Sequence, residues 1–230
     1  MRRHRGAARL VAGVGLLLAF LALPPTSAWP DEAVAAAAGH RGLQVAAVQA
    51  GERIAPLFGL NTEPVAAGEV AAKWQAVEAD IEREQEVLER CRRRAACPAA
   101  ARDLLDIVAE GAGHTGLARV GRINRAVDLA IAPASDEVQW GVADHWSPPF
   151  ETLQSRRGDC EDYAIVKYVA LLQAGLPPSD VKIVILKNLS PAEDHAAVAA
   201  RVDGQWLILD NRKLALVRDT DVVGSIPKFL

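Results

Sequence analysis

The stretch GDCEDYA, residues 158–164, sets a cysteine among acidic residues at the start of a predicted helix over 159–174. Apolar side chains recur along one face of that helix, at Ala164, Tyr168, Leu171 and Leu172. Gly175 follows where helices commonly end, and the prolines just beyond it prevent continuation. The pattern therefore predicts a helix with one face in a core and Cys160 in its first turn.

An antiparallel sheet is predicted downstream of this helix. Residues 181–187 are rich in β-branched side chains and predict a strand. Residues 195–202 and 205–210 flank Asp203-Gly204, which is a strong signal for a two-residue hairpin turn. These segments predict three consecutive strands.

The predicted turn fixes the register of the hairpin. Val202 faces Gln205, and the same register makes His195 and Asp210 diagonal neighbours on one face of the sheet. Their Cβ atoms would lie about 7 Å apart or less. We therefore expect a side-chain hydrogen bond between His195 and Asp210.

Three amphipathic helices are predicted upstream, over residues 68–90, 97–110 and 116–131. Asn124 interrupts the apolar stripe of the third, and we interpret it as a hydrogen-bonded core residue that ties down a loop. Residues 133–157 show little periodicity and predict a long loop, whose Trp140 and Trp146 would line a substrate cleft. Helices followed by a helix packed on an antiparallel sheet indicate an α+β fold.

The first 28 residues have the features of a secretory signal peptide. Arginines precede an apolar run, Leu10–Leu23, that is too short for an ordinary membrane-spanning helix of about 20 residues. Pro24-Pro25 and the small residues up to Ala28 then supply a break and a cleavage site. The alternative is an uncleaved membrane anchor. We predict a signal peptide over 1–28, a loosely ordered lead-in over 29–68 and one domain over 69–230.

The composition is that of a globular exported protein. The chain has 230 residues, of which 50% are hydrophobic and 24% charged. Removal of residues 1–28 would take away four arginines and no acidic residue, which changes the formal net charge from −3 to −7. This charge gives no support for a nucleic-acid partner. We expect a periplasmic or secreted protein with no stable membrane insertion after cleavage.

Three cysteines cannot all pair within one exported chain. Cys91 and Cys97 can bridge only if the helix that contains Cys91 ends nearby, and Pro98 favours such an end because proline is common at the first position of a helix. We expect a Cys91–Cys97 disulfide, which leaves Cys160 as the free thiol.

Cys160 is a candidate nucleophile, because unpaired backbone N–H groups at a helix N-terminus favour the thiolate. The neighbouring carboxylates act in the opposite direction, so the site needs a protonated histidine, a metal ion or both. The predicted hairpin supplies His195 as the base and Asp210 as the group that orients it. The sequence therefore predicts a Cys160–His195–Asp210 triad.

These features resemble the bacterial transglutaminase-like cysteine peptidases. The resemblance covers residues 69–212 and rests on Trp140-Gly141, Asp144-His145-Trp146, Pro149–Leu153, Gly158–Ala164, Lys167-Tyr168 and the segment 181–212. It implies a papain-like fold and a triad of Cys160, His195 and Asp210. His145 departs from the family pattern, since many members carry an aromatic residue there.

The resemblance also implies a calcium ion near the nucleophile, held by Asp159 and Glu161 with Asp162 as a further ligand. Clustered carboxylate oxygens suit Ca²⁺ rather than zinc, and a dication would offset the crowded negative charge. The alternative is helix capping, with Asp159 as the N-cap and Asp162 as its partner three residues later. One carboxylate can serve both purposes.

The expected function is that of a periplasmic cysteine endopeptidase acting on a surface or periplasmic protein, such as a biofilm adhesin. The resemblance also implies an inner-membrane receptor as a regulatory partner. The same thiol would serve an amidase or an acyl transferase, because an acyl-enzyme reacts with water or with an amine. A third alternative is a catalytically silent exported module that binds a peptide at Trp140 and Trp146.

Overall fold

The computed structural model describes residues 56–60, 65–93, 97–188, 194–222 and 225–229. All of them belong to one structural unit, Arg41–Leu230. The predicted signal peptide lies outside the described residues, and its cleavage stays a prediction. Among the helices that are described, none is both long and apolar enough to cross a membrane.

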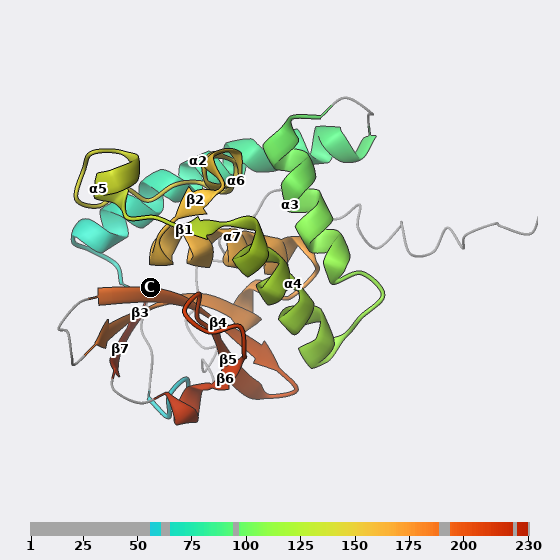
Figure 1. Cartoon of the computed structure of the whole chain (residues 1–230). Coiled ribbons are helices and arrows are strands. Elements are labelled where there is room, and N and C mark those ends of the chain that lie inside the picture. Colours follow the sequence, from blue (N-terminus) through green and yellow to red (C-terminus); the bar gives the residue numbers. More distant parts are fainter. Residues whose placement is uncertain (1–55, 61–64, 94–96, 189–193, 223–224, 230) are drawn as a thin grey trace, which may run out of the picture. The chain divides into compact units, whose positions relative to one another are not determined.

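A five-stranded antiparallel sheet forms one layer of this unit (Figure 1). In spatial order its strands are β6 (Val217–Arg218), β5 (Gln205–Leu209), β4 (Asp194–Val202), β3 (Val181–Asn188) and β7 (Ser225–Phe229). The strands β3, β4 and β5 confirm the predicted ones. The two edge strands were not predicted, since β6 has only 2 residues and β7 contains Pro227, which is tolerated at a sheet edge but weakens a strand prediction.

The hairpin of β4 and β5 has the predicted register. Asp203 and Gly204 have positive φ angles of 50° and 79°, as the two-residue turn requires. Val202 pairs with Gln205, and the ladder continues until Val198 pairs with Leu209. Asp210 therefore leaves β5 beside the start of β4.

The helices gather on one side of the sheet (Figure 1). They include α2 (Glu69–Arg93), α3 (Ala99–Glu110), α4 (Gly116–Ala130), α6 (Pro149–Ser155) and α7 (Cys160–Gln173). The helix α7 contacts β3 and β4 on one side and α3, α4 and α6 on the other. It is the central helix of the layer, and its mostly apolar residues are buried on nearly all sides.

Side chains of the sheet enter two separate cores. In β3 they alternate between the helical side and the opposite side, with Ile183 and Ile185 on the first and Val184 and Leu186 on the second. Leu57 is fully buried in the second core, and the backbone N–H of Phe58 donates to Oδ2 of Asp219 at 2.6 Å. Residues 56–60, which lie in the predicted lead-in, thus pack against the sheet.

Residues 133–157, predicted as a long loop, contain regular structure, so this prediction is wrong. They include α5 (Asp136–Gln139) and α6, and they lie between β1 (Ala132–Pro133) and β2 (Arg157–Gly158), which pair in parallel. Helices of 4 and 7 residues are too short to show a helical period. The pairing of β1 with β2 joins distant positions and leaves no local pattern.

Cys91 and Cys97 form a disulfide between α2 and α3, with their Cα atoms 5.2 Å apart. The helix α2 ends at Arg93, close enough to Cys91 for the bridge to close, and α3 begins directly after Pro98. Cys160 is the free cysteine of the described residues.

Candidate active site

Cys160 is the first residue of α7 and is partly buried. Its Sγ accepts a hydrogen bond from the backbone N–H of Ala196 at 3.4 Å, and its thiol donates to Oε2 of Glu161 at 3.0 Å. Burial raises the pKa of the Cys160 thiol, and the charge of Glu161 adds to this effect. The thiol is therefore protonated in this arrangement, and a base must take its proton before Sγ can act as a nucleophile.

His195 and Asp210 form a buried pair beside Cys160. His195 is the second residue of β4, Asp210 directly follows β5, and Nε2 lies 3.0 Å from Oδ1. Burial alone would raise the pKa of Asp210, but hydrogen bonds from His195 and Arg212 outweigh it and hold that pKa well below its usual range. The ionised carboxylate engages Nε2 of the imidazole and leaves Nδ1 for another partner.

Arg212 is a second partner of Asp210 that the sequence analysis did not identify as a site residue. Its backbone N–H donates to Oδ1 at 2.9 Å, and its Nη2 donates to Oδ2 at 2.7 Å. The predicted hairpin register already places position 212 opposite His195, which is the signal that could have revealed it. The guanidinium and the imidazole share one carboxylate.

Cys160 and His195 line the same cleft, which has a volume of about 650 Å³. The lining also includes Val70, Ala134, Asp144, Trp146, Asp159, Glu161, Ile185, Asp194 and Arg212. Trp146 thus lines this cleft, and its role in binding a substrate stays a prediction. Trp140 is not among the lining residues: it caps the short helix α5, is 37% exposed, and packs its ring against His145 with centroids 5.0 Å apart.

Carboxylates crowd together beside Cys160. Oxygens of Asp136, Asp144 and Glu161 lie within 4.8 Å of one another, and a second group joins Asp159, Cys160 and Glu161. Burial raises the pKa of Glu161 to about 9, with a further contribution from the charge of Asp159. Oδ1 of Asp159 is buried and has no hydrogen-bond partner among the described residues. A set of hard oxygens with one unsatisfied atom fits Ca²⁺.

Asp162 is fully buried and caps the helix, as the alternative interpretation expects. Its Oδ2 accepts the N–H of Asp159 at 3.3 Å, and its Oδ1 accepts the N–H of Ser147 at 2.9 Å. Burial raises its pKa to about 7 although the bond from Ser147 opposes the shift. An oxygen of Asp162 also lies within 4.8 Å of oxygens of Asp136 and Asp159. Capping and a place in the acidic cluster are therefore compatible.

Three members of this neighbourhood escaped the sequence analysis: Asp136, Asp144 and Lys73. Lys73 of α2 forms ion pairs with Asp144 and with Glu69, the latter at 2.8 Å. Each residue lies too far from Cys160 in the sequence for a local pattern to connect them. Asp144 belongs to a segment on which the family resemblance rests. That resemblance is the one sequence signal from which Asp144 could have been predicted as a site residue.

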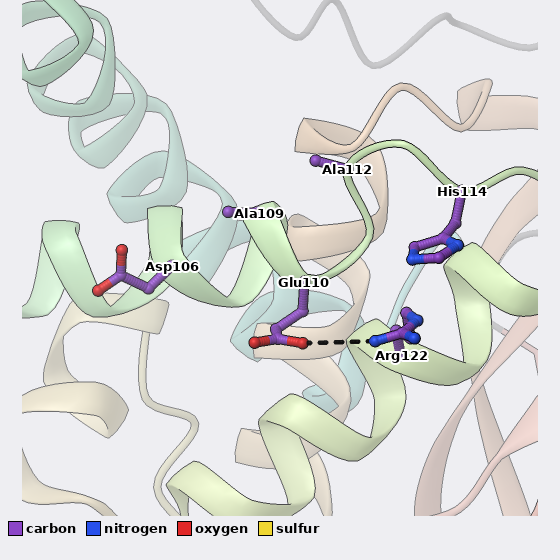
Figure 2. Close-up of a pocket in the computed structure, with 6 residues that line it drawn as sticks. All are labelled: Asp106, Ala109, Glu110, Ala112, His114 and Arg122. Atoms are coloured by element: carbon purple, nitrogen blue, oxygen red, sulfur yellow. Dashed lines mark ion pairs between the residues drawn. The ribbon is translucent and has the colours of Figure 1, made fainter.

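A second hollow lies between α3 and α4 and differs in chemistry from the cleft. It is lined by Asp106, Ala109, Glu110, Ala112, His114 and Arg122. Figure 2 shows Glu110 and Arg122 facing each other there. Nη1 of Arg122 lies 3.9 Å from Oε2 of Glu110. None of these lining residues is a cysteine, serine or threonine, so the cleft at Cys160 is the candidate active site.

The fold is α+β and transglutaminase-like, with a cysteine-bearing helix packed on an antiparallel sheet. The sequence model of the bacterial transglutaminase-like cysteine proteinases (BTLCP) matches residues 86–222. The chain belongs to this family, which confirms the resemblance found in the sequence.

Two solved structures of LapG from Legionella pneumophila show the same fold. One has a TM-score of 0.50 at 18% identity, covering 62% of this chain and 80% of LapG. Calcium-bound LapG also has a TM-score of 0.50 at 18% identity, covering 64% of this chain and 81% of LapG.

A curated relative matches a shorter segment. The UPF0252 protein MJ1282 of Methanocaldococcus jannaschii is 30% identical over 71 residues. That segment is 30% of this chain and 20% of the relative. The chain thus spans about one fifth of the length of this relative.

Proposed function

We propose that this protein is a cysteine endopeptidase in which Cys160 is the nucleophile, His195 the general base and Asp210 the group that orients His195. The proposal rests on the 3.0 Å contact of His195 Nε2 with Asp210 Oδ1, together with the cleft that His195 and Cys160 both line. Membership of a cysteine proteinase family supports the same chemistry.

The proposed reaction begins when Nδ1 of His195 accepts the Sγ proton and the thiolate attacks the carbonyl carbon of a peptide bond. Backbone N–H groups at the start of α7 stabilise the resulting oxyanion. His195 then gives its proton to the leaving amine, and a thioester remains on Cys160. Water attacks the thioester with His195 again as the base, which releases the acid and restores the thiol.

We infer that Ca²⁺ is a cofactor, held by Asp159 and Glu161 with Asp136, Asp144 or Asp162. The packed carboxylates and the unsatisfied Oδ1 of Asp159 support this inference. When bound, the ion would supply positive charge that offsets the carboxylates beside the thiol.

We propose a periplasmic or extracellular location and a surface or periplasmic protein as the substrate, with a biofilm adhesin as one example and an inner-membrane receptor as the regulator. The predicted signal peptide supports export. The Cys91–Cys97 disulfide also supports it, because disulfides persist mainly in oxidising compartments.

The test is a gel assay in which purified protein is incubated with large surface proteins encoded beside it, with and without a chelator. We expect discrete fragments from the wild type and none from Cys160→Ala, which should remain folded because the change removes only the thiol. Release of ammonia or coupling to an added amine without fragments would indicate an amidase or acyl transferase instead. Peptide binding with an unreactive thiol would indicate a silent binding module.

A further inference from the structure

A buried ion pair lies in the helical layer and is not used by the proposed chemistry. Nζ of Lys167 on α7 lies 2.7 Å from Oδ1 of Asp128 on α4. The side chains are 0% and 4% exposed. Taking two charges out of water costs several kcal/mol per ion, and well-packed apolar side chains are often at least as stabilising. Stability alone therefore does not account for this pair.

Asn124 extends the pair to a third element. Its Nδ2 lies 3.2 Å from Oδ2 of Asp128 and 3.3 Å from the backbone oxygen of Leu214, and the residue is fully buried. The prediction that Asn124 ties down a loop is thus confirmed. Leu214 belongs to the segment 210–216, and that segment begins with Asp210.

The segment 210–216 is folded tightly around Asp210. The N–H of Lys213 donates to the backbone oxygen of Asp210 at 3.0 Å, and the N–H of Arg212 donates to its Oδ1 at 2.9 Å. A hydrogen bond that holds Leu214 therefore also holds the short turn that presents the Asp210 carboxylate. The hydrogen bond from Asn124 to Leu214 thus helps to set the orientation of the Asp210 side chain.

Lys167 links α7, the helix that carries Cys160, to Asp128 and Asn124. It follows Cys160 by about two helical turns and therefore projects from nearly the same side of α7. Burial lowers the pKa of the Lys167 amine, while the charges of Asp128 and Asp210 oppose that shift. The negative charge of Asp210 therefore acts on the Lys167 amine in addition to that of Asp128.

We propose that Asn124, Asp128 and Lys167 form a buried polar brace that sets the position of the Asp210 segment relative to the helix that carries Cys160. The three are positioning residues, since the contacts that define the brace are with one another and with Leu214. This inference rests on the proposed triad, because Asp210 matters for turnover only if it orients His195.

The test compares wild type, Asn124→Ala, Asp210→Ala and the double variant. Two quantities are measured: the rate constant for alkylation of Cys160 by iodoacetamide at neutral pH, and the proton NMR resonance of the His195 Nε2–H bound to Asp210. We expect Asn124→Ala to slow alkylation about tenfold and to shift or broaden that resonance. In the Asp210→Ala background the Asn124 change should have no further effect on the rate, because the side chain through which Asn124 acts on His195 is absent.

A second variant and a control separate positioning from folding. Asp128→Asn combined with Lys167→Met removes both charges together, so it leaves no unpaired buried ion and should remain folded while it slows alkylation. Tyr163→Phe deletes another buried hydrogen bond of α7, from Tyr163 to the oxygen of Ile131 at 2.6 Å, and should lower only the unfolding temperature.

Two results distinguish the failure of the brace from the failure of the triad. Additive effects of Asn124→Ala and Asp210→Ala, or an unchanged His195 resonance in both brace variants, would overturn the brace alone. A normal alkylation rate in Asp210→Ala would overturn the triad, and the proposed brace with it.

Discussion

Asp210 is the residue at which several contacts of the site converge. Its Oδ1 lies 3.0 Å from Nε2 of His195, and its Oδ2 accepts a hydrogen bond from Nη2 of Arg212 at 2.7 Å. A carboxylate held from two sides has little freedom to rotate, so the imidazole that it binds is held as well. The guanidinium of Arg212 also offsets part of the negative charge on Asp210. We therefore expect Asp210 to act mainly by orienting His195, and less by stabilising positive charge on the imidazole.

We expect His195→Ala to reduce the rate of Cys160 alkylation and of substrate turnover by about 100-fold or more, because the thiol loses its proton acceptor. Asp210→Asn should reduce both rates less, since an amide oxygen can still accept the bond from Nε2. His114→Ala, in the hollow of Figure 2, is the matched control and should react like the wild type. Near-normal turnover by His195→Ala would contradict the proposed triad.

Glu84 on α2 is a second residue whose environment has a measurable consequence. Its Oε1 accepts the N–H of Phe150 at 3.0 Å, while Oε2 is buried without a partner among the described residues. Burial raises the pKa of Glu84 to about 8. Because this folded-state pKa lies above the unfolded value, the folded state retains a proton that the unfolded chain releases. Glu84 therefore lowers stability progressively as the pH rises from about 4.5 to about 8.

Glu84→Gln should remove this pH dependence while the amide oxygen still accepts the bond from Phe150. At pH 8.5 we expect the free energy of unfolding of the variant to exceed that of the wild type by about 2 kcal/mol. This is less than the full pKa shift implies, because the side chain is partly exposed. At pH 5 the difference should be small. Urea unfolding at several pH values measures the difference. The exposed Glu86→Gln on the same helix is the control, and an equal gain at both pH values would contradict the assignment to Glu84.

At the scale of elements, local patterns were sufficient to predict the helix and the hairpin that carry Cys160, His195 and Asp210. The apolar face after Cys160 predicted α7, and Asp203-Gly204 fixed the register that brings His195 to Asp210. Both features depend on residues a few positions apart, so they can be predicted from a single sequence. The fold class and three of the five strands follow from the same kind of pattern.

The features that escaped prediction depend on contacts between distant segments. The acidic cluster takes Asp136 from α5, Asp144 from the following loop and Glu161 from α7. The pairing of β1 with β2 likewise joins positions on either side of α5 and α6. No periodicity or spacing records such contacts, because only the packed tertiary structure creates them.

The connection between α2 and α3 carries a prediction about stability. Cys91 is buried against the core, and its disulfide closes a short loop to Cys97. Replacement of both cysteines by alanine should lower the free energy of unfolding by about 2.4 kcal/mol, because the unfolded chain loses a constraint on its conformations. Urea unfolding curves with and without reductant measure the loss. Cys160→Ala should keep the full response to reductant, and a stability indifferent to reductant would contradict a structural role.

At the scale of the whole folded unit, the site lies where the helical layer meets the sheet. The helices supply Cys160 and the acidic cluster, whereas β4 and the end of β5 supply His195 and Asp210. The proposed triad therefore requires the two layers to keep a fixed relative position. Two features act at this junction: the proposed brace at Asn124, and the carboxylates that a cation would draw together.

Calcium should consequently stabilise the folded protein as a whole. A ligand that binds only the folded state adds about 2.7 kcal/mol when its concentration is about 100 times Kd. We expect chelator-stripped protein to show a rise in Tm and a titration heat when Ca²⁺ is added. Asp159→Ala and Glu161→Ala should each reduce both responses, because each removes oxygens from the proposed ligand set.

The comparison must use the calcium-dependent change in Tm rather than Tm itself. Asp159 is also the N-cap of α7, so its replacement costs about 1 kcal/mol of stability whether or not a metal binds. Asp106→Ala removes an exposed carboxylate from α3 outside the cluster and should leave the calcium response intact. If stripped wild type shows neither heat nor a shift in Tm, and chelation leaves the alkylation of Cys160 unchanged, the carboxylates beside the thiol serve as helix caps and solvated charges alone.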